Sequence, residues 1–309
     1  MSRVAVAGVV NVRLAHAVER FPVPFASSQH RLGALSVRLS GTGWTNATTL
    51  RALGSEVVFA TYVGSDALGL VATHGLRARG WYGATTLVCE EQPRALVLYD
   101  LDGARAGTTD LRSVRHLSYP PEVFAAALDE WRPDVAMLNC TQFTEPLLAV
   151  AIARVVPIAT DVHRVTDANT PGKQEWMRSA TILACSHEQL PHGPYAWIEA
   201  VWRRFGTPLT LVGCGPEGAL VGVGTDRAVW HVGPATPRGV RYTSGAGDTL
   251  LAAFVHHDAL ADPVMAARYA VLAAGWKVGG GPEEEFALSG AELAGLGDAH
   301  GLPVARRLC

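Results

Sequence analysis

The residues with the clearest chemical potential lie in the string Ser244-Gly245-Ala246-Gly247-Asp248. Small residues let backbone N–H groups converge there, and the apolar pattern from Thr249 onward predicts that a helix starts at this point. Free N–H groups and the positive end of a helix dipole both favour phosphate. A carboxylate beside such a site, Asp248, can accept the proton of an attacking hydroxyl, as phosphoryl transfer requires. The alternative interpretation is a glycine-rich turn in which Asp248 is only a helix cap.

A second glycine-rich string, from Gly213 to Gly218, has the spacing of a dinucleotide-binding fingerprint, but its surroundings argue against that function. Ala219–Gly222 continues as a strand rather than a helix, and about 20 residues further on the chain has Arg238 instead of an acid. We therefore predict a tight hairpin. No GxxxxGK[ST] string occurs in the sequence, which disfavours a P-loop kinase.

The bulk composition favours a compact protein that binds small molecules. Of the 309 residues, 49% are hydrophobic and 17% are charged, which is enough apolar material for a buried sheet and too little charge for disorder. The net charge is -2 and no basic run stands out, so we expect neither a nucleic-acid nor a membrane partner. An α/β fold of this length can share one core, which predicts a single domain over residues 1–309.

The cysteines and the start of the chain predict a reduced, cytoplasmic protein. The five cysteines are scattered and have no CxxC spacing, which fits neither a disulfide framework nor a zinc site. The first apolar run is interrupted by Asn11 and Arg13 before any small-residue cleavage site, so we interpret it as a buried strand rather than a signal peptide. The most apolar later stretch, Leu147 to Ala153, is too short to span a bilayer.

Short runs rich in Val and Ile alternate with longer helical patterns along most of the chain. This alternation predicts an α/β fold, a doubly wound and mainly parallel sheet with helices on both faces. The expected strands are Val4–Val10, Val57–Val63, Val135–Leu138, Pro157–Asp161 and Leu209–Gly213. The expected helices are Asn46–Leu53, Leu68–Arg79, Glu145–Arg154 and Tyr195–Phe205.

Two stretches, Phe21–Leu39 and Arg94–Leu111, break this alternation. Their patterning is shorter, more polar and strand-like, and Asp102-Gly103 predicts a hairpin turn in the second stretch. We expect a small β lid, formed from about residues 12–40 and 94–111, beside the main sheet.

With these motifs the sequence resembles the ribokinase-like (PfkB-type) carbohydrate and nucleoside kinases. Their C-terminal signature, Asp-Thr-x-Gly-Ala-Gly-Asp, is matched from Tyr242 to Asp248 at every position except the first. Their N-terminal signature, Gly-Gly-x-x-x-Asn followed by Leu-Gly and Gly-x-Asp-x-x-Gly, is matched by Gly41–Asn46, Leu53-Gly54 and Gly64–Gly69. Thr42 replaces the second glycine. The resemblance runs from about residue 3 to about residue 280, and two ordered signatures make it specific.

The resemblance implies a catalytic role for the C-terminal signature. Gly245, Ala246 and Gly247 would form the anion hole, and Asp248 would be the base that activates the acceptor hydroxyl. The first signature would line the acceptor pocket.

In that acceptor pocket the resemblance places Asn46, Gly41 and Gly43. An amide can both donate to and accept from sugar hydroxyls, but from the residues alone Asn46 is equally well a helix N-cap. Asn11 follows the first strand and would also contact the acceptor. Where the family often continues to an acidic residue, this chain has Arg13.

Arg13 cannot accept hydrogen bonds from vicinal hydroxyls. Either the acceptor carries an anionic group, or its recognition has moved elsewhere in the pocket. Arg105, beside the predicted hairpin turn, could close over an anionic acceptor as part of the lid, although a solvated charge explains it as well.

The family also has an Asn-x-x-Glu string whose Glu helps to hold hydrated Mg²⁺ near the phosphates. Glu188 matches that Glu, with Cys185 or Ser186 in place of the Asn depending on the register. Because Mg²⁺ keeps several waters, losing the amide need not abolish binding. A solvated Glu188 at a helix start is the other interpretation.

Nucleotide contacts are implied at Gly215 and Gly218, at Thr243 and Ser244, and at Lys277. For the two glycines, a plain turn explains the sequence equally well. By family analogy Lys277 would flank the adenine, but a helix C-terminus with a favourable lysine accounts for it without a ligand.

The resemblance as a whole implies an ATP-dependent kinase that phosphorylates a primary hydroxyl of a sugar or nucleoside-like molecule. ATP and Mg²⁺ would be its cofactors, and a monovalent cation is left open. A homodimer through the lid sheets is implied as well. A second interpretation is a degenerate member that binds nucleotide or sugar as a sensor or scaffold, because Arg13 and Tyr242 replace acidic residues of the family.

Overall fold

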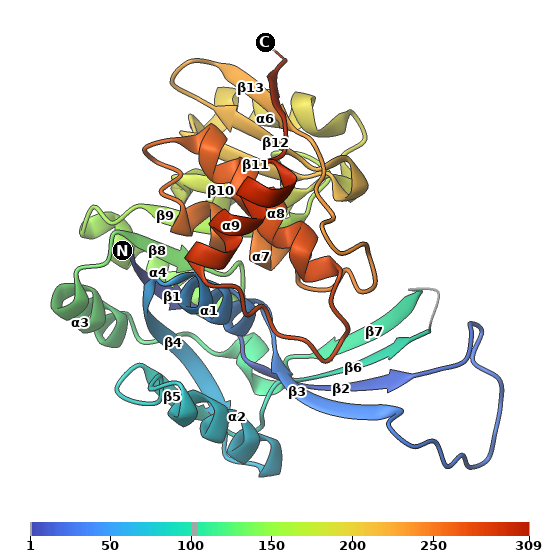
Figure 1. Ribbon diagram of the computed structural model, residues 1–309. Coiled ribbons are helices and arrows are strands. Elements are labelled where there is room, and N and C mark those ends of the chain that lie inside the picture. Colours follow the sequence, from blue (N-terminus) through green and yellow to red (C-terminus); the bar gives the residue numbers. More distant parts are fainter. Residues whose placement is uncertain (1, 101–103, 309) are drawn as a thin grey trace.

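The computed structural model describes residues 2–100 and 104–308, and a ten-stranded sheet forms the body of the protein (Figure 1). Its strands are β1 (Arg3–Ala7), β4 (Glu56–Gly64), β5 (Thr86–Cys89), β8 (Val135–Leu138), β9 (Ile158–Arg164), β10 (Ile182–Ser186), β11 (Leu209–Gly213), β12 (Ala219–Val223), β13 (Ala228–Val232) and β14 (Ala305–Arg307). They lie in the order β14-β13-β12-β11-β10-β9-β8-β1-β4-β5. From β11 to β5 all neighbours are parallel, and β12, β13 and β14 extend the sheet antiparallel at one edge.

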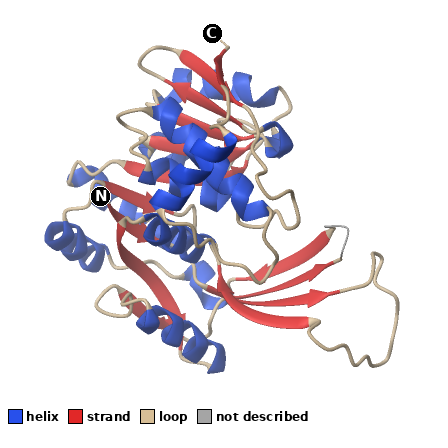
Figure 2. Cartoon of the chain, viewed as in Figure 1, coloured by secondary structure: helices blue, strands red, loops and turns tan. Residues whose placement is uncertain are grey.

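Helices cover both faces of this sheet (Figure 2). One face carries α1 (Thr42–Leu53), α2 (Ala67–Ala78), α7 (Ala246–His256), α8 (Pro263–Val278) and α9 (Gly290–His300). The other face carries α3 (Pro121–Trp131), α4 (Pro146–Ala153), α5 (Gln174–Ser179) and α6 (Gly193–Phe205). Strand β1 is buried on both sides because its side chains alternate: Val4 and Val6 join the first core, and Ala5 and Ala7 join the second. The predicted fold class is confirmed.

Most element boundaries differ from the predicted ones only at the ends, but in the stretch Phe21–Leu39, predicted to be strand-like, the strand begins only at Leu35. Val135–Leu138 and Leu209–Gly213 are strands with the predicted limits. The first strand ends at Ala7 instead of Val10. Helix α1 begins at Thr42 instead of Asn46, so its first turn contains residues with low helix propensity. Tertiary contacts therefore decide where this helix starts.

A second, four-stranded sheet has the order β3-β2-β6-β7 and projects from the body (Figure 1). Its strands are β2 (Asn11–Ala17), β3 (Leu35–Ser40), β6 (Arg94–Tyr99) and β7 (Arg105–Asp110). β6 and β7 form an antiparallel hairpin, and the predicted turn residues Asp102 and Gly103 lie outside the described residues. We call this four-stranded sheet the lid sheet.

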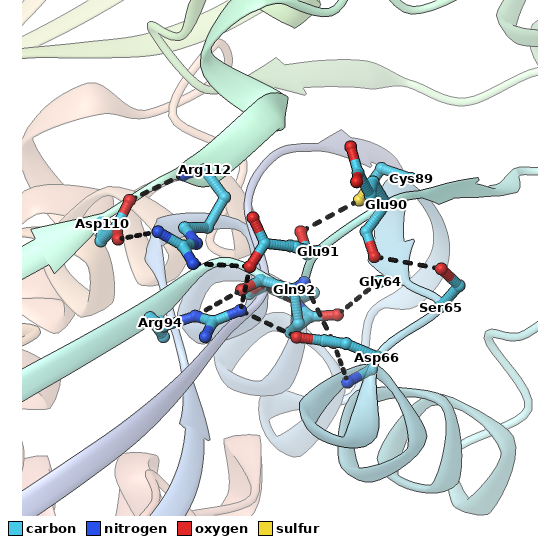
Figure 3. Close-up of polar contacts among 12 residues, drawn as sticks. Gly64, Ser65, Asp66, Cys89, Glu90, Glu91, Gln92, Arg94, Asp110 and Arg112 are labelled. Atoms are coloured by element: carbon cyan, nitrogen blue, oxygen red, sulfur yellow. Dashed lines mark hydrogen bonds and ion pairs between the residues drawn. The ribbon is translucent and has the colours of Figure 1, made fainter.

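The root of the lid sheet is fixed to the body by a polar network (Figure 3). Arg94, the first residue of β6, donates to Asp66 Oδ2 over 2.8 Å, and Asp66 Oδ1 caps α2 by accepting from the Gly69 N–H over 2.9 Å. Arg112 bridges Glu91 and Asp110, at the end of β7. The network therefore anchors both strands of the β6–β7 hairpin where they leave the body.

The four described cysteines, Cys89, Cys140, Cys185 and Cys214, are free thiols, and Cys309 lies outside the described residues. Among the residues that the structure describes, no helix combines the length and the apolar character needed to cross a membrane.

Candidate active site

A cleft of about 1280 Å³ lies between the lid sheet and the carboxyl ends of the parallel strands. This is the place where open α/β sheets bind ligands. Of the residues singled out in the sequence, those that line it are Asn11, Arg13, Gly41, Arg105, Glu188, Gly215, Gly218, Thr243, Ser244, Gly245, Ala246, Gly247, Asp248 and Lys277. Asn46 and Gly43 are not part of its walls.

The N-terminus of α7 presents backbone donors to the cleft. Gly245 caps the helix with a left-handed backbone (φ 81°), which an L-residue rarely adopts and which turns the following N–H groups toward one point. The Ala246 N–H makes a long bond of 3.3 Å to the Thr243 carbonyl. Within the described chain, the N–H groups of Gly245, Gly247 and Asp248 have no hydrogen-bond acceptor. They are available to an anion.

Asp248 is the third residue of α7, and its carboxylate lines the cleft beside these donors. Burial raises its pKa to about 6, and the nearby charge of Asp161 adds to the rise. His163 and a hydrogen bond with the Thr42 side chain act in the opposite direction. A carboxylate with a pKa near neutrality is well matched to a general base.

Asn46 lies behind the cleft, where it positions the segment that carries Asp248. It is 1% exposed, and its Nδ2 donates to the Asp248 carbonyl over 3.0 Å. Its Oδ1 accepts from Asn139 Nδ2, also over 3.0 Å. Both polar atoms of the Asn46 side chain are thus used inside the protein, so direct contact with an acceptor, as the family pattern implies, does not fit its placement.

The two glycines of the first signature have different surroundings. Gly41 has φ 100° and lines the cleft, where a Cβ would lie 2.6 Å from the Val9 carbonyl oxygen. A Cβ on Gly43 would lie 2.6 Å from the backbone of Gly8, so Gly43 is needed for close packing of α1 on the chain after β1.

Asp161 and His163, at the end of β9, also line the cleft. Asp161 Oδ1 accepts from the His163 N–H over 2.7 Å, and its Oδ2 lies 3.7 Å from His163 Nδ1. His163 has φ 57°, an uncommon conformation for a residue with a side chain. The position of this pair at the carboxyl end of a strand is the signal by which the sequence could have indicated it.

Glu188 lies at the cleft rim in a short 3-10 helix (His187–Gln189), 3.6 Å from Arg164 Nε. Asp161 Oδ2 stands 3.8 Å from where a Cβ would lie on Gly247. A cation between this carboxylate and a bound phosphate would offset their repulsion, and carboxylate oxygens suit Mg²⁺. Among the described residues, no group of three or more His, Cys, Asp or Glu could hold a metal. Asp161 and Glu188 are the carboxylates of the cleft that could hold a hydrated Mg²⁺ ion.

The string from Gly213 to Gly218 is a hairpin, as predicted. β11 and β12 pair antiparallel, and the Cys214 N–H donates to the Gly218 carbonyl over 2.8 Å. Gly215 (φ 57°) and Gly218 (φ 91°) supply the left-handed residues of the turn and line the cleft. A Rossmann-type function for this string is excluded because no helix follows it.

Arg13 is held by the protein itself. Its guanidinium donates to the Pro282 carbonyl and lies 5.8 Å from the centre of the Tyr242 ring. The two residues that depart from acidic family positions are therefore in contact with each other. Asn11, two residues earlier on the same face of β2, is 7% exposed and its Oδ1 has no partner within the described chain.

Basic side chains from several elements form ion pairs with the segment after α8, residues 279–286. Arg38 of the lid sheet lies 3.2 Å from Glu283, Arg238 lies 2.6 Å from Glu284, and Arg79 lies 2.7 Å from Glu285. We call residues 279–286 the clamped segment.

Comparison with known proteins is informative at the level of structure. No family model matches the sequence, and no curated protein matches it. Among solved structures, the chain is similar to a microbiome-derived acarbose kinase, Mak1 (TM-score 0.84, 22% identity, covering 96% of this chain and 98% of that one). It is also similar to ribokinase from Arabidopsis thaliana complexed with ribose and ATP (TM-score 0.74, 18% identity, 96% and 98% coverage).

A third similar structure is the nucleoside kinase of Methanocaldococcus jannaschii, an archaeal member of the ribokinase family (TM-score 0.75, 14% identity, 97% and 99% coverage). All three matches span nearly the whole of both chains. The protein therefore has the fold of the ribokinase-like carbohydrate and nucleoside kinases.

Proposed function

We propose that the protein is an ATP-dependent kinase that transfers the γ-phosphoryl group of ATP to a primary hydroxyl of a sugar or nucleoside-like small molecule. The observation that carries this proposal is the carboxylate of Asp248 beside backbone N–H groups at the N-terminus of α7 that have no acceptor in the described chain. The solved structures with this fold support the substrate class, because their names include acarbose, ribose and nucleosides.

In the proposed reaction, the acceptor oxygen forms a bond to the γ-phosphorus while the bond from that phosphorus to the β,γ-bridging oxygen breaks. Asp248 takes the proton of the hydroxyl, and ADP leaves with the electron pair of the broken bond. The N–H groups of Gly245, Ala246 and Gly247 stabilise the charge on the phosphoryl oxygens. Mg²⁺, held through its waters by Glu188 and Asp161, would supply further positive charge to the phosphates.

The remaining cleft residues have auxiliary roles in this proposal. Asn11 and Gly41 contact the acceptor, and Arg105 closes over it from the lid sheet. Gly215, Gly218, Thr243 and Ser244 contact the nucleotide, and closure of the lid sheet keeps water from competing for the phosphoryl group. A kinase of this kind works as one domain in the reduced, ATP-rich cytoplasm.

The test is acceptor-dependent release of ADP across a panel of sugars, nucleosides and polyols. We expect turnover with at least one acceptor, and a loss of roughly 10²–10⁴-fold in Asp248→Asn because the general base is missing. The variant must still bind nucleotide with the affinity of the wild type, which separates loss of chemistry from loss of fold. Turnover of Asp248→Asn at the wild-type rate would remove Asp248 from the mechanism.

The second candidate is a protein that binds nucleotide or sugar without turnover. The contact between Arg13 and Tyr242 favours it, because this contact fills a region where the related kinases place acidic residues. Nucleotide binding without acceptor-dependent ADP release on the whole panel would support this candidate over the kinase.

We also propose that the lid sheet mediates a homodimer. On its face away from the cleft, Leu14 is paired with Val37 on β3 and with Leu96 on β6, and these side chains are 39%, 57% and 48% exposed. Adjacent apolar side chains exposed to water favour burial against a second copy.

A further inference from the structure

Lys277 is a buried lysine beside the N–H donors of the proposed phosphate site. It is the last but one residue of α8, which packs against α7. It is 7% exposed, yet it lines the cleft. Its Cε lies 3.9 Å from where a Cβ would stand on Gly245, so the side chain extends to the N-cap of α7.

The Lys277 ammonium has no anionic partner. Its Nζ donates to a neutral acceptor, the Glu284 carbonyl, over 3.1 Å. The nearest carboxylates are already engaged, since Glu284 pairs with Arg238 over 2.6 Å and Glu285 with Arg79 over 2.7 Å. No ion pair within residues 2–100 and 104–308 includes Lys277. Lysines are almost never buried unless they are paired, so an anion bound at this position would stabilise the buried ammonium.

The charges around Lys277 also favour binding of an anion beside its ammonium. Burial, together with the charges of Arg13 and Arg238, lowers its pKa to about 8, and the charges of Glu284 and Glu285 act in the opposite direction. The ammonium is still mainly protonated at neutral pH and is partly compensated by the negative end of the α8 dipole. A phosphate placed between this ammonium and the N-terminus of α7 would neutralise both positive charges at once.

The choice of residue is informative as well. The sequence contains only two lysines, Lys173 and Lys277, against 24 arginines. Lysine provides a compact charge at the end of a narrow stem, whereas arginine needs room for a planar fork. A lysine at this crowded position fits a point contact to a single phosphate oxygen.

We propose that the ammonium of Lys277 binds a phosphate oxygen of the nucleotide at the Gly245–Gly247 site and is the resident cation of the phosphate half of the cleft. This inference rests on the proposed kinase function and specifies one of its contacts. It differs from both sequence-based interpretations of Lys277, which were a neighbour of the adenine and a ligand-free helix C-terminus.

The experiment is calorimetric binding of the β,γ-imido analogue of ATP with Mg²⁺, and of adenosine, to the wild type and to Lys277→Met. We expect the variant to bind the triphosphate analogue about 10- to 100-fold more weakly, the range for hydrogen bonds to charged groups. Adenosine affinity should change by less than about 2-fold, because the lost contact is to phosphate.

Two further variants make the result specific. Lys277→Arg retains the charge and should keep more affinity for the triphosphate analogue than Lys277→Met. Lys173→Met removes the other lysine, whose Nζ lies 3.4 Å from Cys140 Sγ outside the cleft, and should bind like the wild type. Because Lys277→Met removes an unpaired buried charge, it should unfold at the same temperature as the wild type or a higher one.

Equal affinity of the wild type and Lys277→Met for the triphosphate analogue would overturn the inference while leaving the kinase proposal intact. If Lys277→Met lost as much affinity for adenosine as for the triphosphate analogue, the inference would be overturned too, because the contact would then lie in the adenosine half of the nucleotide. If the wild type binds no triphosphate analogue, both the inference and the proposed function are wrong.

Discussion

At the residue scale, the protonation state of Asp248 is set by groups from distant parts of the chain. Burial and Asp161 raise its pKa, while His163 and Thr42 lower it, and the result is a pKa of about 6. Relative to the ordinary value of 3.8, the folded protein binds this proton more tightly. The free energy of unfolding therefore falls as the pH rises from 3.8 to about 6, and it stays lower above that range. At pH 7 the Asp248→Asn variant should accordingly unfold at a higher temperature than the wild type.

The same pKa predicts the acid limb of the pH–rate profile. Because only ionised Asp248 accepts a proton, kcat/KM should rise with pH along a limb centred near 6. Thr42→Val removes the hydrogen bond that stabilises the ionised form, so its limb should move to higher pH. The measurement is kcat/KM against pH for both proteins.

Thr48→Val is the matched control for this prediction. The Thr48 hydroxyl donates to the Trp44 carbonyl within α1 and does not contact Asp248, so the control should keep the wild-type limb. A limb that stays in place in Thr42→Val would remove Thr42 from the positioning of the base.

From the sequence, consecutive residues could be placed together, whereas contacts that depend on packing could not be predicted. The glycine turn and the carboxylate of Asp248 are consecutive residues, so their spacing predicted a common site, which the cleft now contains. The side-chain contact of Thr42 with Asp248 depends on how α1 packs against α7. Likewise, only tertiary structure turns Asn46 away from the cleft and toward Asn139.

At the element scale, the N-terminus of α7 depends on the left-handed conformation of Gly245. Gly245→Ala would find ordinary space, since the nearest atom to its Cβ, Thr45 Cγ2, lies 3.6 Å away. The backbone conformation is the obstacle, and a left-handed L-residue is destabilising by about 1–2 kcal/mol. We expect chemical denaturation to show this loss of stability in Gly245→Ala. The variant should also bind the triphosphate analogue more weakly, because the N–H groups of α7 move.

Gly206→Ala is the control that separates loss of stability from loss of nucleotide binding. Gly206 ends α6 with a left-handed φ of 66°, has no atom within 4 Å of the place where a Cβ would lie, and is outside the cleft. It should lose similar stability and retain the wild-type affinity for nucleotide. Equal loss of nucleotide affinity in both variants would show that general destabilisation, and not the geometry at α7, controls binding.

The sequence predicted those elements whose own pattern determines them. β8 is a short apolar run between Asp134 and Asn139, β11 is a short run rich in Leu and Val after Pro208, and the limits of both match the predicted ones. The start of α1 at Thr42 could not be predicted because its first residues have poor helix propensity, and the close approach of Gly43 to Gly8 is visible only in the fold. The antiparallel strands β13 and β14 complete one edge of the sheet and carry no comparable local signal.

At the scale of the whole molecule, the outer face of the lid sheet governs the proposed assembly. Val37→Asp places a charge at the β3 end of the apolar row formed with Leu14 and Leu96. Because burying an unpaired carboxylate is unfavourable, we expect the variant to be a monomer in sedimentation velocity at concentrations where the wild type is a dimer.

Ile152→Asp is the control for this prediction. Ile152 lies on α4, is 55% exposed, and should leave the assembly unchanged. A wild type that sediments as a monomer at high concentration would contradict the homodimer.

The division into a large sheet and a small one was accessible from the sequence because two stretches break the alternation of strands and helices. The way in which the lid sheet is attached to the body could not be predicted from the sequence. The network of Asp66, Arg94, Glu91 and Arg112 joins residues from α2, β6 and the segments around the hairpin, and each of them alone is an ordinary surface charge in the sequence (Figure 3).

The clamped segment links the two ends of the cleft. Arg13 and Arg38 hold it from the lid sheet, and its Glu284 carbonyl holds the ammonium of Lys277. Any acceptor that changes the angle of the lid sheet therefore changes the surroundings of that ammonium. Linkage then requires reciprocity: the factor by which an acceptor tightens nucleotide binding equals the factor by which nucleotide tightens binding of that acceptor. In the proposed kinase, the clamped segment would carry this coupling, because it contacts both the lid sheet and Lys277.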